Sequence, residues 1–387
     1  MRALTLGLAV LVVVAVLAPP AAAHSGVKVK VIASGLDAPR HLAFGDRGDL
    51  YVAEAGRGAG VATPDPSQCF VGGEGPACMG ATGAITKIDR WGHQRRIVSG
   101  LASFANVPGN TNPIGPHGIT VLGSNLVVFT NGGPTEPKTP AGATISRDTL
   151  AAANPVADLF GRLLAVGHRG RIHRIADIWG FERDVNPDAG VGNPAIDSNA
   201  VDVLFDRWRF VVADAGGNAI DVVRPFGRVS NLAVFANRLV PNPDPAGEDI
   251  AMQAVPTSVV LGPDDKYYVS QLTGFPFPVG GANVYRVDPR TGATTVVASG
   301  FTNIMDLAFG RDGTLYVLEI DQNSLLVPGD EGAIFAIKRN GSQRQIQLPA
   351  GTLTAPGGIT VGRRGALYVS NQTFVPGSGE VLRISHR

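Results

Sequence analysis

The fold is decided by residues 307–319, which read LAFG, then a four-residue turn, then LYVLE. The same pattern stands at residues 42–54, where LAFG is followed by LYVAE, and at residues 359–371, where ITVG is followed by LYVSN. Each copy is an apolar run that ends in a glycine, a tight turn, and a second run that ends in a polar residue. Short runs rich in β-branched and aromatic residues between such turns are typical of β-strands. The pattern therefore predicts a repeated β-hairpin.

Weaker copies of this hairpin bring the number of units to six. They stand at residues 119–131, 201–214 and 259–271. Each unit continues with a third apolar run, such as GAITKI at 83–88 and GAIFAI at 332–337, and some add a fourth. A repeat of roughly 40 to 50 residues made of short strands and glycine-rich turns is the signature of a propeller blade. We therefore expect an all-β, six-bladed β-propeller with four-stranded blades.

The two ends of the chain complement each other. The sixth unit stops after its third strand at Ile384, whereas residues 27–35 read VKVKVIASG and match the fourth-strand pattern without a unit of their own. The N-terminal strand should therefore complete the last blade, which closes the ring and removes unpaired sheet edges. Residues 24–387 are accordingly predicted to form one domain.

The first 23 residues carry the signature of an export signal. Arg2 precedes an apolar stretch at residues 4–17, and three alanines at 21–23 form a small-residue cleavage site. This predicts cleavage after Ala23 and a secreted protein of the extracellular space or the cell envelope, without a stable membrane anchor. The two cysteines of the chain, Cys69 and Cys78, lie in one glycine-rich loop and are expected to form a disulfide in such an oxidising compartment.

The charge pattern excludes one class of partner. The formal net charge is +1, and the basic residues are scattered along the chain. A nucleic-acid binder needs a concentrated basic surface, so we expect no nucleic acid as partner. The sequence points to an extracellular ligand or protein without identifying it, and it leaves the oligomeric state open.

The extra length of the chain falls on one end of the predicted propeller. The turns between first and second strands, and between third and fourth strands, are short. The connections between second and third strands and between blades are long, as at residues 132–159 and 179–198. Because neighbouring strands alternate in direction, both kinds of long connection emerge on the same face. Loops on a rigid scaffold commonly carry function, so we place the site at this long-loop mouth.

Polar residues gather at the predicted mouth and form the candidate ligand-binding set, without any assigned catalytic residue. The second strands end there in Glu54, Asn131, Asp214, Gln271, Glu319 and Asn371. The starts of the first strands add Arg40, His41, His117, Asn199 and Asp306. In one interpretation a Ca²⁺ or similar ion polarises an ester or lactone beside His117 or His41, which moves protons. Its ligands would be the carboxylates of Glu54, Asp214, Asp306 and Glu319 and the amides of Asn131 and Asn199. In the other, which we favour, each acidic or amide side chain caps its own blade by accepting backbone N–H groups.

Two local features add detail. The loop LTGFPFP at residues 272–278 places Phe275 and Phe277 between prolines at the mouth. These rings serve either as a platform for a flat ligand or as packing over a neighbouring blade. A short helix is expected over residues 146–153, with Ser146 as its N-cap.

Three stretches resemble a known family. Residues 255–259 (VPTSV), 268–278 (YVSQLTGFPFP) and 299–310 (SGFTNIMDLAFG) are similar to the ScyD/ScyE family of exported bacterial proteins, and the similarity extends over almost the whole mature chain. This resemblance implies a secreted, NHL-like propeller and brings no established catalytic residue. A more distant resemblance is to six-bladed hydrolases of the gluconolactonase and senescence-marker type. Residues 39–41 (PRH) depart from that pattern, since those enzymes typically have a metal-binding Glu there.

The sequence thus predicts a non-catalytic binding protein for a small molecule, glycan or protein. Arg40 at the mouth favours an anionic ligand. The alternative is a metal-dependent, lactonase-like hydrolase or lyase that acts at the channel mouth, and a third interpretation is an exported structural scaffold. Whether the protein is an enzyme stays open at this point.

Overall fold

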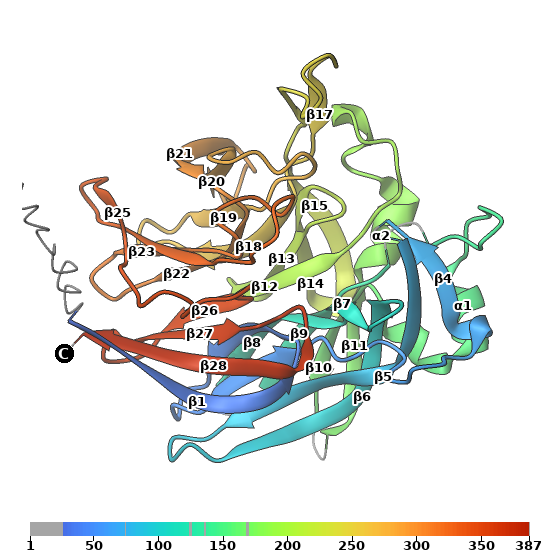
Figure 1. The fold of residues 1–387 in the computed structure, drawn as a ribbon, viewed down its shortest axis with the longest axis horizontal. Helices are drawn as coiled ribbons and strands as arrows, with labels where there is room; N and C mark the ends of the chain where they lie inside the picture. Colours follow the sequence, from blue (N-terminus) through green and yellow to red (C-terminus); the bar gives the residue numbers. More distant parts are fainter. Residues whose placement is uncertain (1–25, 74, 124–125, 135–136, 168–169, 387) are drawn as a thin grey trace, which may run out of the picture.

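The computed structural model describes residues 26–73, 75–123, 126–134, 137–167 and 170–386. The predicted export signal, residues 1–23, lies outside them. Within the described ranges the strands form six antiparallel sheets of four or more strands and one separate two-stranded sheet (Figure 1). Each of the six larger sheets corresponds to one repeat of the sequence, and the predicted all-β propeller is confirmed.

The first three sheets, each given from its innermost strand outward, come from the N-terminal half of the chain. The first contains β2 (Pro39–Phe44), β3 (Leu50–Glu54), β5 (Gly75–Ile88), β6 (Gln94–Asn106) and β7 (Thr111–Ile114), with β4 (Cys69–Gly72) paired to β5. The second contains β8 (Pro116–Leu122), β9 (Leu126–Asn131), β10 (Arg162–Val166) and β11 (Ile172–Asp177). The third contains β12 (Ala200–Asp206), β13 (Arg209–Asp214), β14 (Ala219–Arg224) and β15 (Arg228–Val234).

The other three sheets follow in chain order. The fourth contains β18 (Pro256–Leu261), β19 (Tyr267–Gln271), β20 (Ala282–Val287) and β21 (Thr294–Phe301). The fifth contains β22 (Ile304–Phe309), β23 (Leu315–Glu319), β24 (Ala333–Ile337) and β25 (Gln343–Gln345). The last contains β26 (Gly358–Val361), β27 (Leu367–Asn371), β28 (Pro376–His386) and β1 (Val27–Asp37).

The innermost strands close a ring. Strand β2 contacts β8, β8 contacts β12, and the series continues through β18 and β22 to β26, which contacts β2 again. The last sheet joins the two ends of the chain, because β1 pairs with β28 from Val27 opposite His386 to Asp37 opposite Pro376. Figure 1 shows this pairing as the blue β1 beside the red β28. The predicted closure by the N-terminal strand is therefore confirmed.

The core lies between the sheets rather than inside any one of them. Tyr51 and Ile85 of the first sheet pack with Ile119 and Phe129 of the second. A strand that is covered by a neighbouring sheet on both faces cannot alternate between apolar and polar residues. This explains why β3 reads LYVAE with every residue buried. Outer strands are exposed instead, as in most of β21.

The long connections carry the elements outside the sheets. Helix α1 (Arg147–Ala153) begins where predicted, since the Ser146 side chain accepts a hydrogen bond from the backbone N–H of Thr149. Helix α2 (Ile178–Val185) was not predicted; it lies in a long connection and is capped by Asp177. Single 3-10 turns are η1 (Pro66–Gln68), η2 (Pro155–Leu159), η4 (Ala189–Val191) and η5 (Pro225–Gly227). None of the helices in the described part of the chain has the length and apolar character needed to cross a bilayer.

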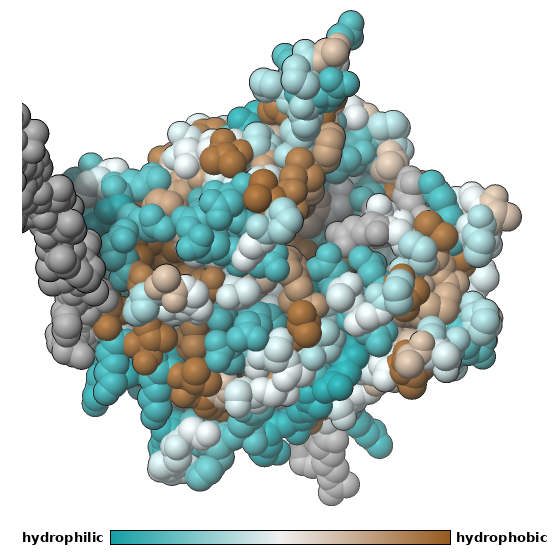
Figure 2. Space-filling view, in the orientation of Figure 1, coloured by the Kyte–Doolittle hydropathy of each residue, from teal (hydrophilic) through white to brown (hydrophobic). Residues whose placement is uncertain are grey.

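Two pairs of short strands stand outside the regular blades. The predicted disulfide joins Cys69 to Cys78, which face each other across the β4–β5 pair. The second pair, β16 (Arg238–Val240) and β17 (Ile250–Met252), forms a hairpin between the third and fourth sheets. Figure 2 shows this hairpin projecting from a body whose apolar surface is broken up by hydrophilic surface.

Candidate functional site

Two rings of residues surround the propeller axis where the innermost strands begin. In β2, β8 and β18 the pairing with the next strand is interrupted by a bulge after the first residue. A bulge changes the direction in which the neighbouring side chains point, so the side chains of two consecutive residues can both lie near the axis. The upper ring consists of Arg40, which follows the first residue of β2, and the residues at the same position of the other five repeats: His117, Val201, Thr257, Met305 and Gly357. The next position gives a lower ring of His41, Gly118, Asp202, Ser258, Asp306 and Gly358.

The upper ring, apart from Gly357, forms the floor of a cavity of about 590 Å³ at the mouth. Long connections supply the walls, and Asn199 contributes an amide to them. The wall is otherwise largely apolar, but it also includes Thr111, Asn112 and the carboxylate of Asp330. Its apolar residues include Ile114, Leu272, Phe277, Ile320, Leu325 and Phe374. Phe277, one of the two aromatic residues predicted at the mouth, thus lines the cavity, whereas the Phe275 side chain is exposed.

Arg40 and His117 give the floor its polar character. The Arg40 side chain is buried and its Nη2 donates a hydrogen bond to the Pro113 carbonyl at 2.5 Å. His117 Nδ1 lies 2.8 Å from the Val201 carbonyl, which can only accept, so this nitrogen carries the proton. Burial, together with the charges of Arg40 and His41, holds the pKa of His117 well below its ordinary value. The floor therefore presents one cation beside one neutral imidazole.

In the lower ring His41 lies between two carboxylates. Its Nδ1 is 3.2 Å from Asp202 Oδ1, and its Nε2 is 3.9 Å from Asp306 Oδ1. Burial acts to lower the pKa of His41, but the charges of Asp306 and Asp202 outweigh it and raise the pKa to about 9. Burial also raises the pKa of Asp306, to about 6, although the His41 charge opposes it. At neutral pH the three residues thus favour an imidazolium between carboxylates.

The same carboxylates fasten neighbouring sheets to each other. Asp202 of β12 accepts a hydrogen bond from the backbone N–H of Val259 on β18, at 2.8 Å. Asp306 of β22 accepts from Ile359 N–H on β26 and from the Ser258 hydroxyl on β18, both at 2.7 Å. Buried polar groups in a low-dielectric interior are costly unless they are paired in this way. The lower ring is therefore part of what holds the propeller closed.

This group could also hold a divalent ion. His41, Asp202 and Asp306 each offer a ligand atom, and these atoms lie within 4.8 Å of one another. No hydrogen bond satisfies either ring nitrogen of His41, although Nδ1 forms an ion pair with Asp202 Oδ1 at 3.2 Å. One imidazole and two carboxylates form a donor set that suits Zn²⁺ or Mn²⁺ better than the all-oxygen shell that Ca²⁺ prefers.

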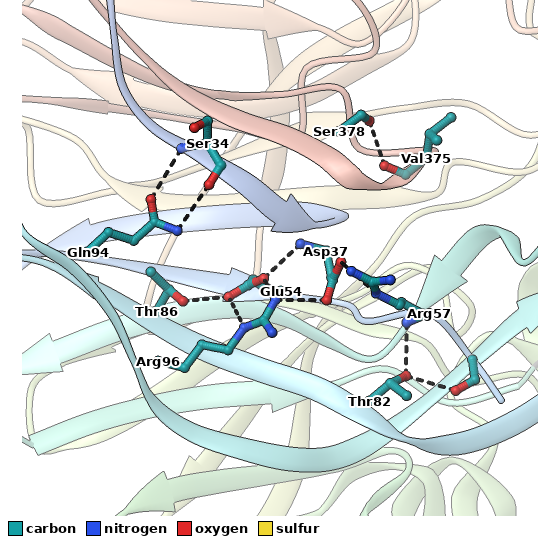
Figure 3. A network of polar contacts seen from close by, with 11 residues as sticks. Ser34, Asp37, Glu54, Arg57, Thr82, Thr86, Gln94, Arg96, Val375 and Ser378 are labelled. Atoms are coloured by element: carbon teal, nitrogen blue, oxygen red, sulfur yellow. Dashed lines mark hydrogen bonds and ion pairs between the residues drawn. The ribbon is translucent and has the colours of Figure 1, made fainter. Parts of the chain in front are cut away.

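Glu54, predicted at the mouth, lies instead within the first sheet, where it is completely buried. It accepts hydrogen bonds from Asp37 N–H at 2.7 Å and from the Thr86 hydroxyl at 2.5 Å, and it forms an ion pair with Arg96 at 2.7 Å. Figure 3 shows these groups converging on the Glu54 carboxylate, with Asp37 also bound to Arg57. Glu54 thus ties the start of the first blade to the strand that completes the last.

The other second-strand residues are placed in the same way. Asp214, Glu319 and Asn371 accept hydrogen bonds from Asn199, Thr302 and Thr354 N–H respectively, each in the segment that leads into the innermost strand. Gln271 accepts from Asn283 N–H at 3.2 Å, and Asn131 donates to the Gly132 carbonyl at 3.3 Å. The geometry of Asp214, Glu319, Asn371 and Gln271 matches the capping interpretation. Asn131 departs from it, because its amide donates and its buried Oδ1 accepts no hydrogen bond. Among the described residues, the structure assembles no cation site from Glu54, Asp214 and Glu319.

Of the residues predicted at the mouth, Arg40, His117 and Asn199 line the cavity together, and His41 and Asp306 meet beneath it. The sequence interpretation missed Asp202. A signal for it did exist, because Asp202 occupies the same repeat position as His41 and Asp306 when the six units are aligned from their first strands.

No protein-family model and no curated protein matches the chain. Solved structures do. A glucose dehydrogenase is 12% identical with a TM-score of 0.51, and the match covers 93% of this chain and 100% of that one. A putative oxidoreductase from Thermus thermophilus is 17% identical (TM-score 0.49, 93% and 100% covered), and a virginiamycin B lyase from Staphylococcus aureus is 12% identical (TM-score 0.46, 93% and 99% covered).

At such identities the likeness shows the fold alone. The chain is similar to propellers that include enzymes, and the ScyD/ScyE resemblance stays a prediction.

Proposed function

We propose that this protein binds a small molecule that joins an anionic group to an apolar body, and that the mouth cavity is the binding site. The observation that carries the proposal is the buried Arg40 guanidinium at the floor of a largely apolar cavity. A volume of about 590 Å³ falls within the range of small-molecule sites, which are usually apolar with a few polar groups that fix orientation. A guanidinium in apolar surroundings pairs well with a carboxylate, sulfonate or phosphate.

The fluorescent probe 8-anilinonaphthalene-1-sulfonate tests this proposal, because it carries an aromatic body and one sulfonate. We expect the folded protein to bind it, and Arg40→Met to weaken binding about tenfold, which corresponds to the loss of one charge-assisted contact. Phe277→Ala should weaken binding as well, through lost apolar contact. The measurement is a fluorescence titration, with circular dichroism to show that each variant is folded.

Arg364→Met is the matched control, since Arg364 is an exposed arginine in the turn between β26 and β27, away from the mouth. It should leave the affinity unchanged. If wild type and Arg40→Met bind the probe equally well, or if wild type does not bind it, the mouth-cavity proposal is wrong.

A second candidate, a metal-dependent hydrolase or lyase, is favoured by the group of His41, Asp202 and Asp306 directly beneath the cavity. It predicts one Zn²⁺ or Mn²⁺ ion per chain by elemental analysis after incubation with the metal and desalting. A chelator should then lower the melting temperature, and His41→Gln should lose the ion while His93→Gln, at an exposed histidine, keeps it. A wild-type protein without stoichiometric metal, and with a melting temperature unchanged by the chelator, rules this candidate out.

A further inference from the structure

Three aromatic side chains project from the face opposite the mouth. Trp91, Trp208 and Phe226 are 69%, 86% and 102% exposed, the highest values for aromatic residues in the described ranges. They lie in the short turns between β5 and β6, β12 and β13, and β14 and β15 respectively. Since the innermost strands begin at the mouth and strand direction alternates, all three turns emerge on the short-turn face.

Two of these aromatic residues also hold a costly backbone conformation. Trp208 and Phe226 have φ values of 62° and 66°, in the left-handed region that disfavours side chains with a Cβ. In most of the tight turns equivalent to that of Trp208 this region is occupied by glycine, as at Gly48 and Gly313, although Asp265 occupies it between β18 and β19. This conformation is energetically unfavourable for residues other than glycine. The Trp208 ring packs edge-on against the Phe205 ring, whereas the Phe226 side chain is wholly exposed. Both rings are thus exposed to solvent on turns whose backbone conformation lowers the stability of the fold.

Arginines surround the exposed rings. The Arg90 guanidinium lies 4.2 Å from the centre of the Trp91 ring. Further exposed arginines at the short turns of the first three sheets are Arg171, Arg207, Arg224 and Arg228. The acidic groups beside them are engaged, Asp89 with His93 and Asp206 with Arg207 and Tyr267. Five exposed arginines at these turns outnumber the two carboxylates, so this part of the surface is net cationic, although the whole chain carries a formal charge of only +1.

The aromatic turns belong to one continuous stretch of the rim. A Cβ at Gly170, in the β10–β11 turn, would lie 3.3 Å from the Ile97 carbonyl on β6, so the turn of the second sheet abuts the first sheet. A Cβ at Gly227, beside Phe226, would lie 2.3 Å from the Ile175 carbonyl on β11, so the third sheet abuts the second. The outer parts of the first three sheets therefore adjoin one another along the rim, and the Trp208 turn lies at the same end of the third sheet.

We propose that this aromatic and basic face docks on the surface of an anionic phospholipid bilayer. Tryptophan and phenylalanine rings favour the headgroup region of a membrane, and arginines are attracted electrostatically to anionic lipids near its surface. The rings stand on separate convex turns rather than around a pocket, which suits insertion between lipids. In this orientation the mouth cavity points away from the membrane and stays accessible to its ligand.

Vesicle sedimentation with the full chain tests the proposal. The protein should bind vesicles of phosphatidylcholine mixed equally with phosphatidylglycerol, and bind phosphatidylcholine alone much less, with binding that falls as salt rises. Tryptophan emission should shift to shorter wavelength on binding, because two of the three tryptophans of the chain, Trp91 and Trp208, lie on this face.

The decisive variant is Trp208→Gly combined with Phe226→Gly, for which we expect at least a tenfold weaker vesicle affinity. Glycine tolerates positive φ, so the melting temperature of the double variant should equal or exceed that of wild type. Leu239→Gly, an exposed apolar residue of the β16–β17 hairpin, is the control and should bind as wild type does. Absence of binding to the anionic vesicles overturns the proposal, as does unchanged binding by the double variant; either result leaves the mouth-cavity proposal intact.

Discussion

Replacing Asp306 with alanine should lower the free energy of unfolding by about 3 to 5 kcal/mol, the range found when one partner of a buried ionic network is removed. The Asp306 carboxylate accepts hydrogen bonds from Ser258, Leu307 and Ile359, and it faces the His41 imidazolium. Alanine leaves all of these groups buried without their acceptor. Because the partners lie on the first, fourth, fifth and last sheets, the loss acts on the closed ring as a whole. Urea denaturation followed by circular dichroism measures it.

Asp312→Ala is the comparison variant for this effect. Asp312 also accepts two hydrogen bonds, from the N–H and hydroxyl of Thr314, but its side chain is largely exposed in a tight turn. Its replacement should therefore cost about 1 kcal/mol or less. If Asp306→Ala costs no more than Asp312→Ala, the fastening role of the lower ring is refuted.

The second large effect is expected at Gly118. A Cβ at this position would lie 2.3 Å from Asp202 Cα and 2.7 Å from the Val201 carbonyl, both backbone atoms of β12. Backbone cannot rotate away as a side chain tip can, so Gly118→Ala must separate β8 from β12. We expect a loss of about 3 kcal/mol or more, at the upper end of overpacking effects. The measurement is again the free energy of unfolding in urea.

Gly190→Ala controls for the substitution itself, since no atom lies within 4 Å of a Cβ built at Gly190 and its backbone is not in the positive-φ region. This variant should be as stable as wild type. Equal stability of Gly118→Ala and Gly190→Ala would show that the innermost strands are less tightly packed than their Cα positions imply.

The propeller and its closure were predictable because they depend on the repeat itself. Residues 27–35 match a fourth strand that the last unit lacks, and this match needs no knowledge of side-chain contacts. The disulfide and the Ser146 cap were predictable for a similar reason, since both are local. Helix α2 was missed because its eight residues lie inside a long connection without a repeat to mark them.

The site was only partly predictable, because it depends on small irregularities of the backbone. The bulge at the start of β2 determines that Arg40 faces the cavity and His41 the axis below it, and no residue type marks such a bulge. In the sequence, Glu54 and Glu319 stand at positions where they could have bound a cation. In the structure their carboxylate oxygens accept hydrogen bonds from backbone N–H groups instead. The left-handed conformations of Trp208 and Phe226 could not be predicted, because turn positions of this kind usually hold glycine, asparagine or aspartate.

The way the chain closes its last sheet also determines how the molecule responds to mechanical force. Val27 and His386 are partners in the β1–β28 pair, so the two ends leave the sheet at the same point. A pull applied between them loads the interstrand hydrogen bonds one after another, as a zipper does, instead of all together in shear. Tension on both ends should therefore peel β1 away at low force, whereas a molecule tethered by one end alone keeps its ring intact.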